Sequence, residues 1–228
     1  MIAALLWPCA AAASGYGWYY ESFSWPTLTA YFGQGSVEQR RAFRRHIDEV
    51  VAEEAQDHFF MFPRSAQDVA LWRGLVDRGL DYAKLGRSDA RAADRVVFMA
   101  FNGDMPVPGF DVRPETTPDF MAPVHLRALR EAASPRGRRL LDAFRFGRSL
   151  GQPERRDACL DRGDEWTCYD AYVVLSPEES RELARELRTA LPHASDIDAF
   201  GRQCVQGWIE ALERTAGAGR GMFLHASD

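Results

Sequence analysis

Apolar side chains recur at intervals of three and four residues along most of the chain, a spacing that predicts amphipathic helices. Most of these helices are preceded by a residue able to cap them. The strongest cap is Ser176, which is followed by proline at the first helical position and by Glu179 at the third. Ser36 has the same relation to Gln39, which predicts a second capping box. The predicted helices span 37–60, 66–80, 89–101, 123–133, 135–146, 177–191 and 197–216.

The last predicted helix has the clearest inner face. Asp196 is expected to cap it, and the Gly217–Gly219 turn is expected to end it. Five residues at helical spacing form the stripe expected to face the core: Ile197, Phe200, Cys204, Trp208 and Leu212.

Three other stretches favour extended structure. The aromatic segment 16–32 is predicted to be a strand or extended, as are 168–175 and 222–224. Residues 96–101 are also compatible with a buried strand in place of a helix. We therefore expect an α+β fold, helix-rich, with a small sheet that includes the N-terminal aromatic segment and the C-terminal strands.

The 228 residues are predicted to form a single domain, 1–228. Residues 102–120 contain four prolines and two glycines, which predict the longest loop of the chain. This segment is the best candidate for a sub-domain boundary and could also serve as a lid over a pocket.

The C-terminal quarter resembles the YfbM-like group of small bacterial proteins. The matching positions are the Leu175–Glu179 segment, Trp208 within its amphipathic helix, and the Gly219–Leu224 ending. The resemblance implies the strand–helix–helix–strand order and no activity, so it assigns a functional role to none of these residues.

The ends and cysteines bear on the cellular compartment. No apolar run approaches the roughly 20 residues that a membrane helix needs. Residues 1–13 partly resemble an export signal but lack a preceding basic residue, so we expect an apolar arm of a cytoplasmic protein, with export as the alternative. Cys159 and Cys168 could form a disulfide that closes a small loop, although free thiols are expected in the cytoplasm.

Charge is distributed unevenly along the chain. Of 28 basic residues only Lys84 is lysine, a bias that we attribute to a GC-rich bacterial genome. The stretch 125–156 holds nine arginines and three acidic residues, a local charge of +6 against −5 for the whole chain. The arginines expected to form a binding patch are Arg127, Arg130, Arg136, Arg138, Arg139, Arg145 and Arg148, with Arg155 and Arg156 beyond them. The alternative is that they pair with acidic residues of the same fold.

Signatures of cofactor and metal chemistry are incomplete. The turn 33–36 could hold an anion but lacks the lysine of a phosphate-binding loop, and helix capping explains its serine. Glu54 and His58 share a helix face, but no second helix supplies matching ligands. Cys204 falls on an apolar stripe, where a thiol is inert. We therefore expect no cofactor and no bound metal.

Two function classes follow. The first is a non-catalytic protein-interaction or binding module of a bacterium, which uses its Arg-rich patch to bind an acidic protein or a phosphate-containing ligand; nucleic acid is disfavoured by the acidic pI of about 5.6. The second is an enzyme with a pocket under the 102–120 loop, for which the candidates are Asp104, Arg113, His125 and the aromatic N-terminal segment.

Overall fold

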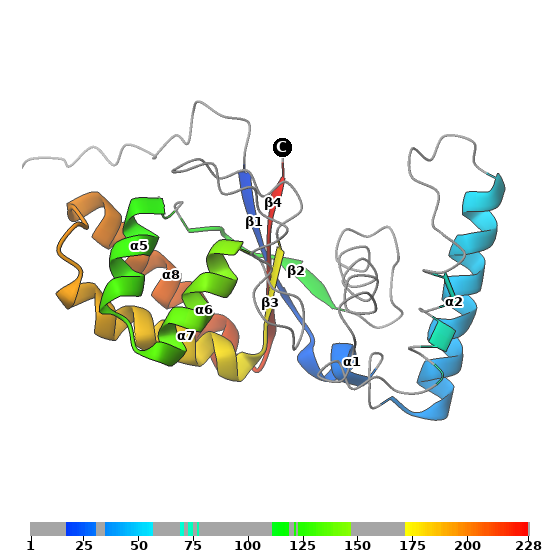
Figure 1. Ribbon diagram of the computed structural model, residues 1–228. Coiled ribbons are helices and arrows are strands. Elements are labelled where there is room, and N and C mark those ends of the chain that lie inside the picture. Colours follow the sequence, from blue (N-terminus) through cyan, green and yellow to red (C-terminus); the bar gives the residue numbers. More distant parts are fainter. Residues whose placement is uncertain are drawn as a thin grey trace, which may run out of the picture.

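A four-stranded antiparallel sheet and six α-helices are the main elements of the part of the chain that the computed structural model describes (Figure 1). The described residues are 17–30, 35–56, 69–70, 73–74, 77, 111–118, 121, 123–146 and 172–227. The prediction of a helix-rich α+β fold is confirmed.

The sheet has the strand order β2-β1-β4-β3. Strand β1 (Gly17–Phe23) pairs along its whole length with β4 (Gly221–Ser227), so the aromatic N-terminal segment and the C-terminal strand lie side by side in the centre. Strand β3 (Tyr172–Leu175) forms one edge and β2 (Val112–Pro114) the other. The sheet therefore contains both the N-terminal aromatic segment and the C-terminal strands, as predicted.

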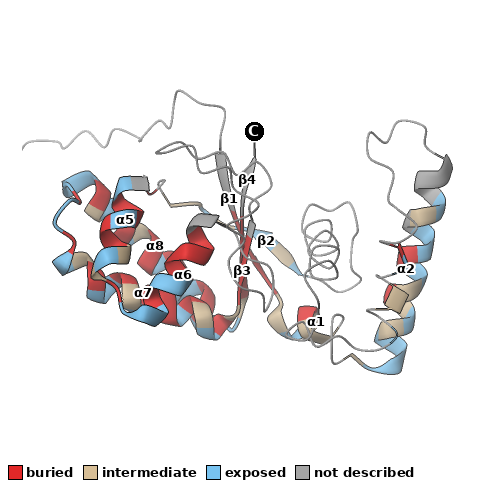
Figure 2. Ribbon diagram, viewed as in Figure 1, coloured by how far each residue is buried: buried red, intermediate tan, exposed pale blue. Residues whose placement is uncertain are grey.

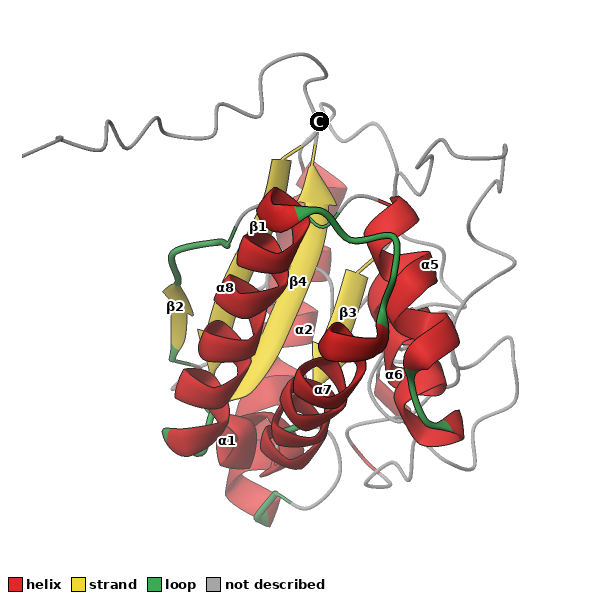
Figure 3. Cartoon of the chain, turned by 90° about the vertical axis from the view of Figure 1, so that its left-hand side faces the viewer, coloured by secondary structure: helices red, strands yellow, loops and turns green. Residues whose placement is uncertain are grey.

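Four helices cover one face of this sheet (Figures 1 and 3). A short 3₁₀ helix, Leu191–His193, follows the third of them. The four helices are α5 (Pro123–Ala132), α6 (Pro135–Phe146), α7 (Pro177–Ala190) and α8 (Ala199–Gly217).

The alternation of strand residues separates two buried faces. Tyr20, Val173 and Leu224 belong to the core beneath the four helices, and each is at most 3% exposed. Phe23 and Phe223 occupy alternate positions in β1 and β4, so their side chains point to the opposite face, where they are fully buried. Figure 2 shows the buried side of the helical layer turned toward the sheet.

Trp208 of α8 is the centre of the helix-side core. It is fully buried, and its ring lies 5.0 Å from the ring of Phe144 and 5.9 Å from that of Tyr20. The Tyr20 hydroxyl donates to the Ala211 carbonyl oxygen at 3.2 Å and is also bonded to the Thr215 hydroxyl. Burial raises the pKa of Tyr20, so this phenol stays neutral. Its hydrogen bonds to Ala211 and Thr215 connect β1 to α8.

The predicted caps at Ser36 and Ser176 form as expected. The Gln39 backbone N–H donates to Ser36 Oγ at 3.2 Å, and the Gln39 side chain accepts from the Ser36 N–H at 2.9 Å. Ser176 and Glu179 make the same reciprocal pair at 3.1 and 3.0 Å. These local signals set the first residues of α2 (Val37–Gln56) and α7.

The predicted start of the last helix is wrong by two residues. Asp198, not Asp196, caps α8, and its Oδ1 accepts from the Gly201 N–H at 2.7 Å. Phe200, expected on the inner stripe, is 45% exposed. Side chains in a first helical turn lean back past the helix end, and the space inside this turn is filled by His125, which packs on Gly201.

Two other predictions fail for short elements. The extended segment predicted over 16–32 ends at Phe23, because Pro26 cannot donate to a strand ladder and instead lies in the first turn of the short helix α1 (Trp25–Thr29). The loop predicted over 102–120 contains the edge strand β2, whose three residues are too few to show an alternating pattern.

Helix α2 lies on the side of the sheet opposite α5–α8 (Figure 1). Phe43 and Ile47 of its predicted stripe are buried, and Asp48 pairs with Arg73 at 2.6 Å. The described residues at 69–70, 73–74 and 77 are helical, as predicted for 66–80.

Several predictions lie outside the described residues. They concern the helix at 89–101, the loop at 102–110, the arm at 1–13 and the bridge between Cys159 and Cys168. The division into one domain also stays a prediction. Among the helices that the structure describes, none combines the length and apolarity needed to cross a bilayer.

Candidate functional site

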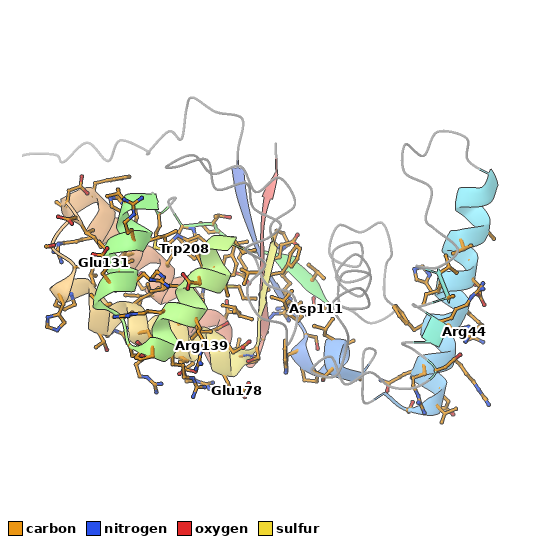
Figure 4. The ribbon with its side chains drawn as sticks, in the orientation of Figure 1. Arg44, Asp111, Glu131, Arg139, Glu178 and Trp208 are labelled. Atoms are coloured by element: carbon orange, nitrogen blue, oxygen red, sulfur yellow. The ribbon has the colours of Figure 1, made fainter. Side chains whose placement is uncertain are left out.

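The predicted arginines fall on two consecutive helices of the layer that covers the sheet. Helix α5 carries Arg127 and Arg130, and α6 carries Arg136, Arg138 and Arg139 (Figure 4 labels Arg139). The side chains of Arg145 and Arg148, and residues 155–156, lie outside the described part of the structure.

Arg130 is used inside the fold. Its Nε and Nη2 donate to the two carboxylate oxygens of Asp142 at 2.6 and 3.1 Å, which makes a bidentate ion pair between α5 and α6. The Asp142 side chain is only 5% exposed, whereas that of Arg130 is 38% exposed. This pair corresponds to the alternative in which an arginine neutralises a carboxylate of its own fold.

Arg138 also has an internal role. Its Nε donates to the Ala133 carbonyl oxygen at 3.1 Å, and its Nη2 donates to the Glu131 carbonyl oxygen at 3.3 Å. These oxygens lie at the end of α5, where helix carbonyls have no partner within the helix. Arg138 therefore caps α5 from the first turn of α6.

Arg136 extends toward α7 and meets a buried carboxylate. Its Nε lies 2.5 Å from Glu182 Oε1, and Arg185 Nη2 lies 3.6 Å from the same oxygen. The Glu182 side chain is 9% exposed, whereas the two arginine side chains are 69% and 71% exposed. Two guanidinium groups thus share one carboxylate, and most of each group faces solvent.

Arg139 adds a third exposed guanidinium on the same face of α6, one turn after Arg136. No hydrogen bond or ion pair holds it among the residues that the structure describes. We call Arg136, Arg139 and Arg185 the guanidinium cluster; with Glu182 it carries a net charge of about +2.

Arg188, on α7 like Arg185, has its hydrogen-bond donors paired with a carboxylate of its own. Its two terminal nitrogens donate to the Glu213 carboxylate of α8 at 2.6 and 2.8 Å. The hydrogen bonds from Arg188 lower the pKa of Glu213, so this carboxyl stays ionised. Arg185, one turn earlier, instead shares the Glu182 carboxylate with Arg136.

Sequence reasoning missed Arg185. Its position outside the buried stripe of α7 marks it as exposed, but its closeness to Arg136 arises from the packing of α6 on α7. Because 49 positions separate the two arginines in the sequence, no local pattern connects them.

The residues proposed for an enzyme have different neighbours. His125 lies in the first turn of α5, its Nε2 3.8 Å from Asp198 Oδ1. Arg113 lies on β2 and pairs with Asp111 at 2.7 Å, and this contact together with Arg220 lowers the pKa of Asp111. Asp104 lies outside the described residues.

Other predicted chemistry has a structural explanation where it is described. Cys204 is buried on the inner stripe of α8 and forms no disulfide. Gly35 is needed because a Cβ there would lie 2.0 Å from the Ala30 carbonyl oxygen. The described residues contain no group of three or more possible metal ligands, and the side chains of Glu54 and His58 are not among them.

No family model, curated protein or solved structure matches this chain. The resemblance of its last quarter to the YfbM-like group stays a prediction.

Proposed function

We propose that this chain is a non-catalytic binding module of the bacterial cytoplasm whose guanidinium cluster binds a negatively charged partner. The observation that carries the proposal is the sharing of one buried carboxylate, Glu182, by two arginines that are 69% and 71% exposed. The partner would be an acidic protein or a phosphate-containing ligand.

The chemistry of arginine suits this role. A guanidinium presents several N–H donors in a planar fork that matches a carboxylate or a phosphate, and it stays charged at any physiological pH. Arg136 contacts Glu182 through its Nε, and its side chain is 69% exposed. Each solvent-exposed pair contributes little by itself, so binding would depend on several contacts made together.

The proposed binding residues are fewer than the sequence suggested. Arg136 and Arg139 stay in the proposal, and Arg185 joins them. Arg130 and Arg138 are assigned to holding α5 and α6 together, because their donors are occupied by Asp142 and by the end of α5. Arg127, Arg145 and Arg148 stay predictions.

Binding of three anionic probes tests the proposal: a peptide in which neutral residues separate the glutamates (the glutamate peptide), a single-stranded oligonucleotide and inorganic polyphosphate. At about 50 mM salt, where screening is weak, at least one should bind the wild-type protein. The double change Arg139→Glu and Arg185→Glu should weaken that binding by about tenfold or more. If no probe binds, or if the double variant binds as well as wild type, the proposal fails.

The control variant carries Arg41→Glu and Arg45→Glu, two exposed arginines on α2. It changes the net charge by the same amount on an element outside the α5–α8 layer. Its binding should stay within about threefold of wild type, because even at this salt concentration the effect of a surface charge decays over about 14 Å. An equal loss in both variants would indicate a response to net charge alone.

The enzyme alternative stays a prediction. Among the described residues, no contact joins His125 to Arg113.

A further inference from the structure

We infer that the partner of the guanidinium cluster is a protein surface rich in aspartate and glutamate, and not a phosphate-bearing molecule. This inference rests on the proposed function and names the chemistry of its ligand. It follows from three features of α6 and α7: the exposure of the arginines, the occupied helix N-termini, and the carboxylates placed between the arginines.

The exposure of the cluster argues against a small anion. A site for free phosphate encloses its ligand with buried donors, because an ion pair in water is weak. Here the three arginines stand on the outer surface of two helices, and only the carboxylate of Glu182 between them is buried. A single phosphate would touch one or two guanidinium groups and stay largely hydrated.

The helix N-termini beside the cluster are already satisfied. Free N–H groups at such ends commonly bind phosphate. At the start of α6, the Gly137 N–H donates to Ser134 Oγ at 3.0 Å, and the Ser134 N–H points at Glu186 Oε2 at 3.4 Å. At the start of α7, the capping box of Ser176 and Glu179 uses the corresponding groups. Neither end offers a cradle for a phosphate.

Glu186 also places its own negative charge at the start of α6. A Cβ on Gly137 would lie 2.3 Å from Glu186 Oε2, so the carboxylate sits directly on the backbone of the first turn. The positive end of the helix dipole already has an anion there. An incoming phosphate would meet a like charge at the point where a helix would otherwise attract it.

Carboxylates are interleaved with the arginines over the rest of the face. Glu178 is exposed in the first turn of α7, and Figure 4 shows it along the same edge of the helical layer as Arg139. Glu182 and Glu186 follow at intervals of four residues. A nucleic acid carries negative charge at every step and would bring phosphates against these groups.

A protein surface avoids that conflict, because it can place acidic side chains opposite the arginines and neutral or basic ones opposite the glutamates. Such a mixed pattern fixes the orientation of the partner and rejects uniformly charged molecules. The pattern of α6 and α7 therefore matches an acidic protein.

Competition among the three probes tests the inference on the full-length protein. The glutamate peptide should bind at least about tenfold more tightly than an oligonucleotide of equal charge and than polyphosphate of equal charge. Arg139→Gln together with Arg185→Gln should abolish most of the peptide binding. This milder pair keeps the side chains polar, and an unchanged melting temperature shows that folding is intact.

Glu178→Gln supplies a second test, in which binding should become stronger and not weaker. Removing this carboxylate should raise the affinity for the oligonucleotide by about two- to threefold if interleaved charge is what rejects phosphates. No change would overturn that step. If the oligonucleotide or polyphosphate binds as tightly as the peptide, and the double variant loses it, the proposed function stands and the acidic-protein inference falls. If no probe binds, both fail.

Discussion

Replacing Arg130 by alanine should destabilise the protein without acting directly on the binding face. The change removes both hydrogen bonds to Asp142, at 2.6 and 3.1 Å, and leaves a carboxylate that is 5% exposed without its bidentate partner. A buried charge that loses its partner costs about 3–5 kcal/mol.

The expected loss lies at or just below the lower limit of that range. The Arg130 side chain is 38% exposed, so water can enter the space that it vacates and partly solvate Asp142. We therefore expect the free energy of unfolding to fall by about 2–3 kcal/mol. For a chain of this length, that corresponds to a melting temperature about 4–12 °C lower.

Chemical denaturation monitored by circular dichroism gives the free energy of unfolding, and Arg139→Ala is the matched control. Arg139 is exposed, and its replacement should change stability by less than about 0.5 kcal/mol while it weakens binding of the glutamate peptide. Arg130→Ala should instead lower stability and leave binding of the glutamate peptide largely unchanged. The assignment of Arg130 to an internal pair is refuted if its variant is as stable as wild type and loses peptide binding as Arg139→Ala does.

The remaining predictions concern the helix-side core and the sheet. Gly201→Ala should lower the free energy of unfolding by about 1–3 kcal/mol, because the new Cβ would lie 2.5 Å from the buried His125 ring; thermal melting checks it, and an unchanged melting temperature contradicts it. Tyr20→Phe should cost about 1–2 kcal/mol in denaturant unfolding, since the buried hydrogen bond to the Ala211 carbonyl is lost; a neutral result would show that the hydroxyl is not needed. Glu21→Gln should stabilise the protein at pH 7 by less than about 1 kcal/mol and not at pH 3.5. Burial raises the pKa of half-buried Glu21, so its destabilising effect develops as the pH rises above the ordinary glutamate pKa; equal effects at both pH values would exclude this cause.

Local chemistry predicted the helix starts where one cap dominates, and was misled where two compete. Ser36 and Ser176 each have a partner at the third helical position, and both helices begin as expected. Asp196 and Asp198 are equivalent as local signals. Asp198 is the residue that caps α8, and its hydrogen-bond partner Gly201 is also the residue on which His125 packs. That packing joins residues far apart in the sequence.

The candidate site was predictable in part for the same reason. The density of arginine in 125–156 pointed to α5 and α6, and Arg139 is exposed as a binding residue should be. That density could not show that Asp142 would take Arg130, or that α7 would bring Arg185 beside Arg136. Both facts depend on how the helices pack.

The pairing of β1 with β4 has a consequence for synthesis of the protein. Gly17 pairs with Ser227 across the sheet, so the two middle strands cannot join until residues 221–227 have left the ribosome. The hairpin of α7 and α8 can assemble earlier, since its helices are close in sequence. Until β4 emerges, the aromatic strand β1 lacks its central partner, and a nascent chain stalled before residue 221 should therefore need a chaperone to stay unaggregated.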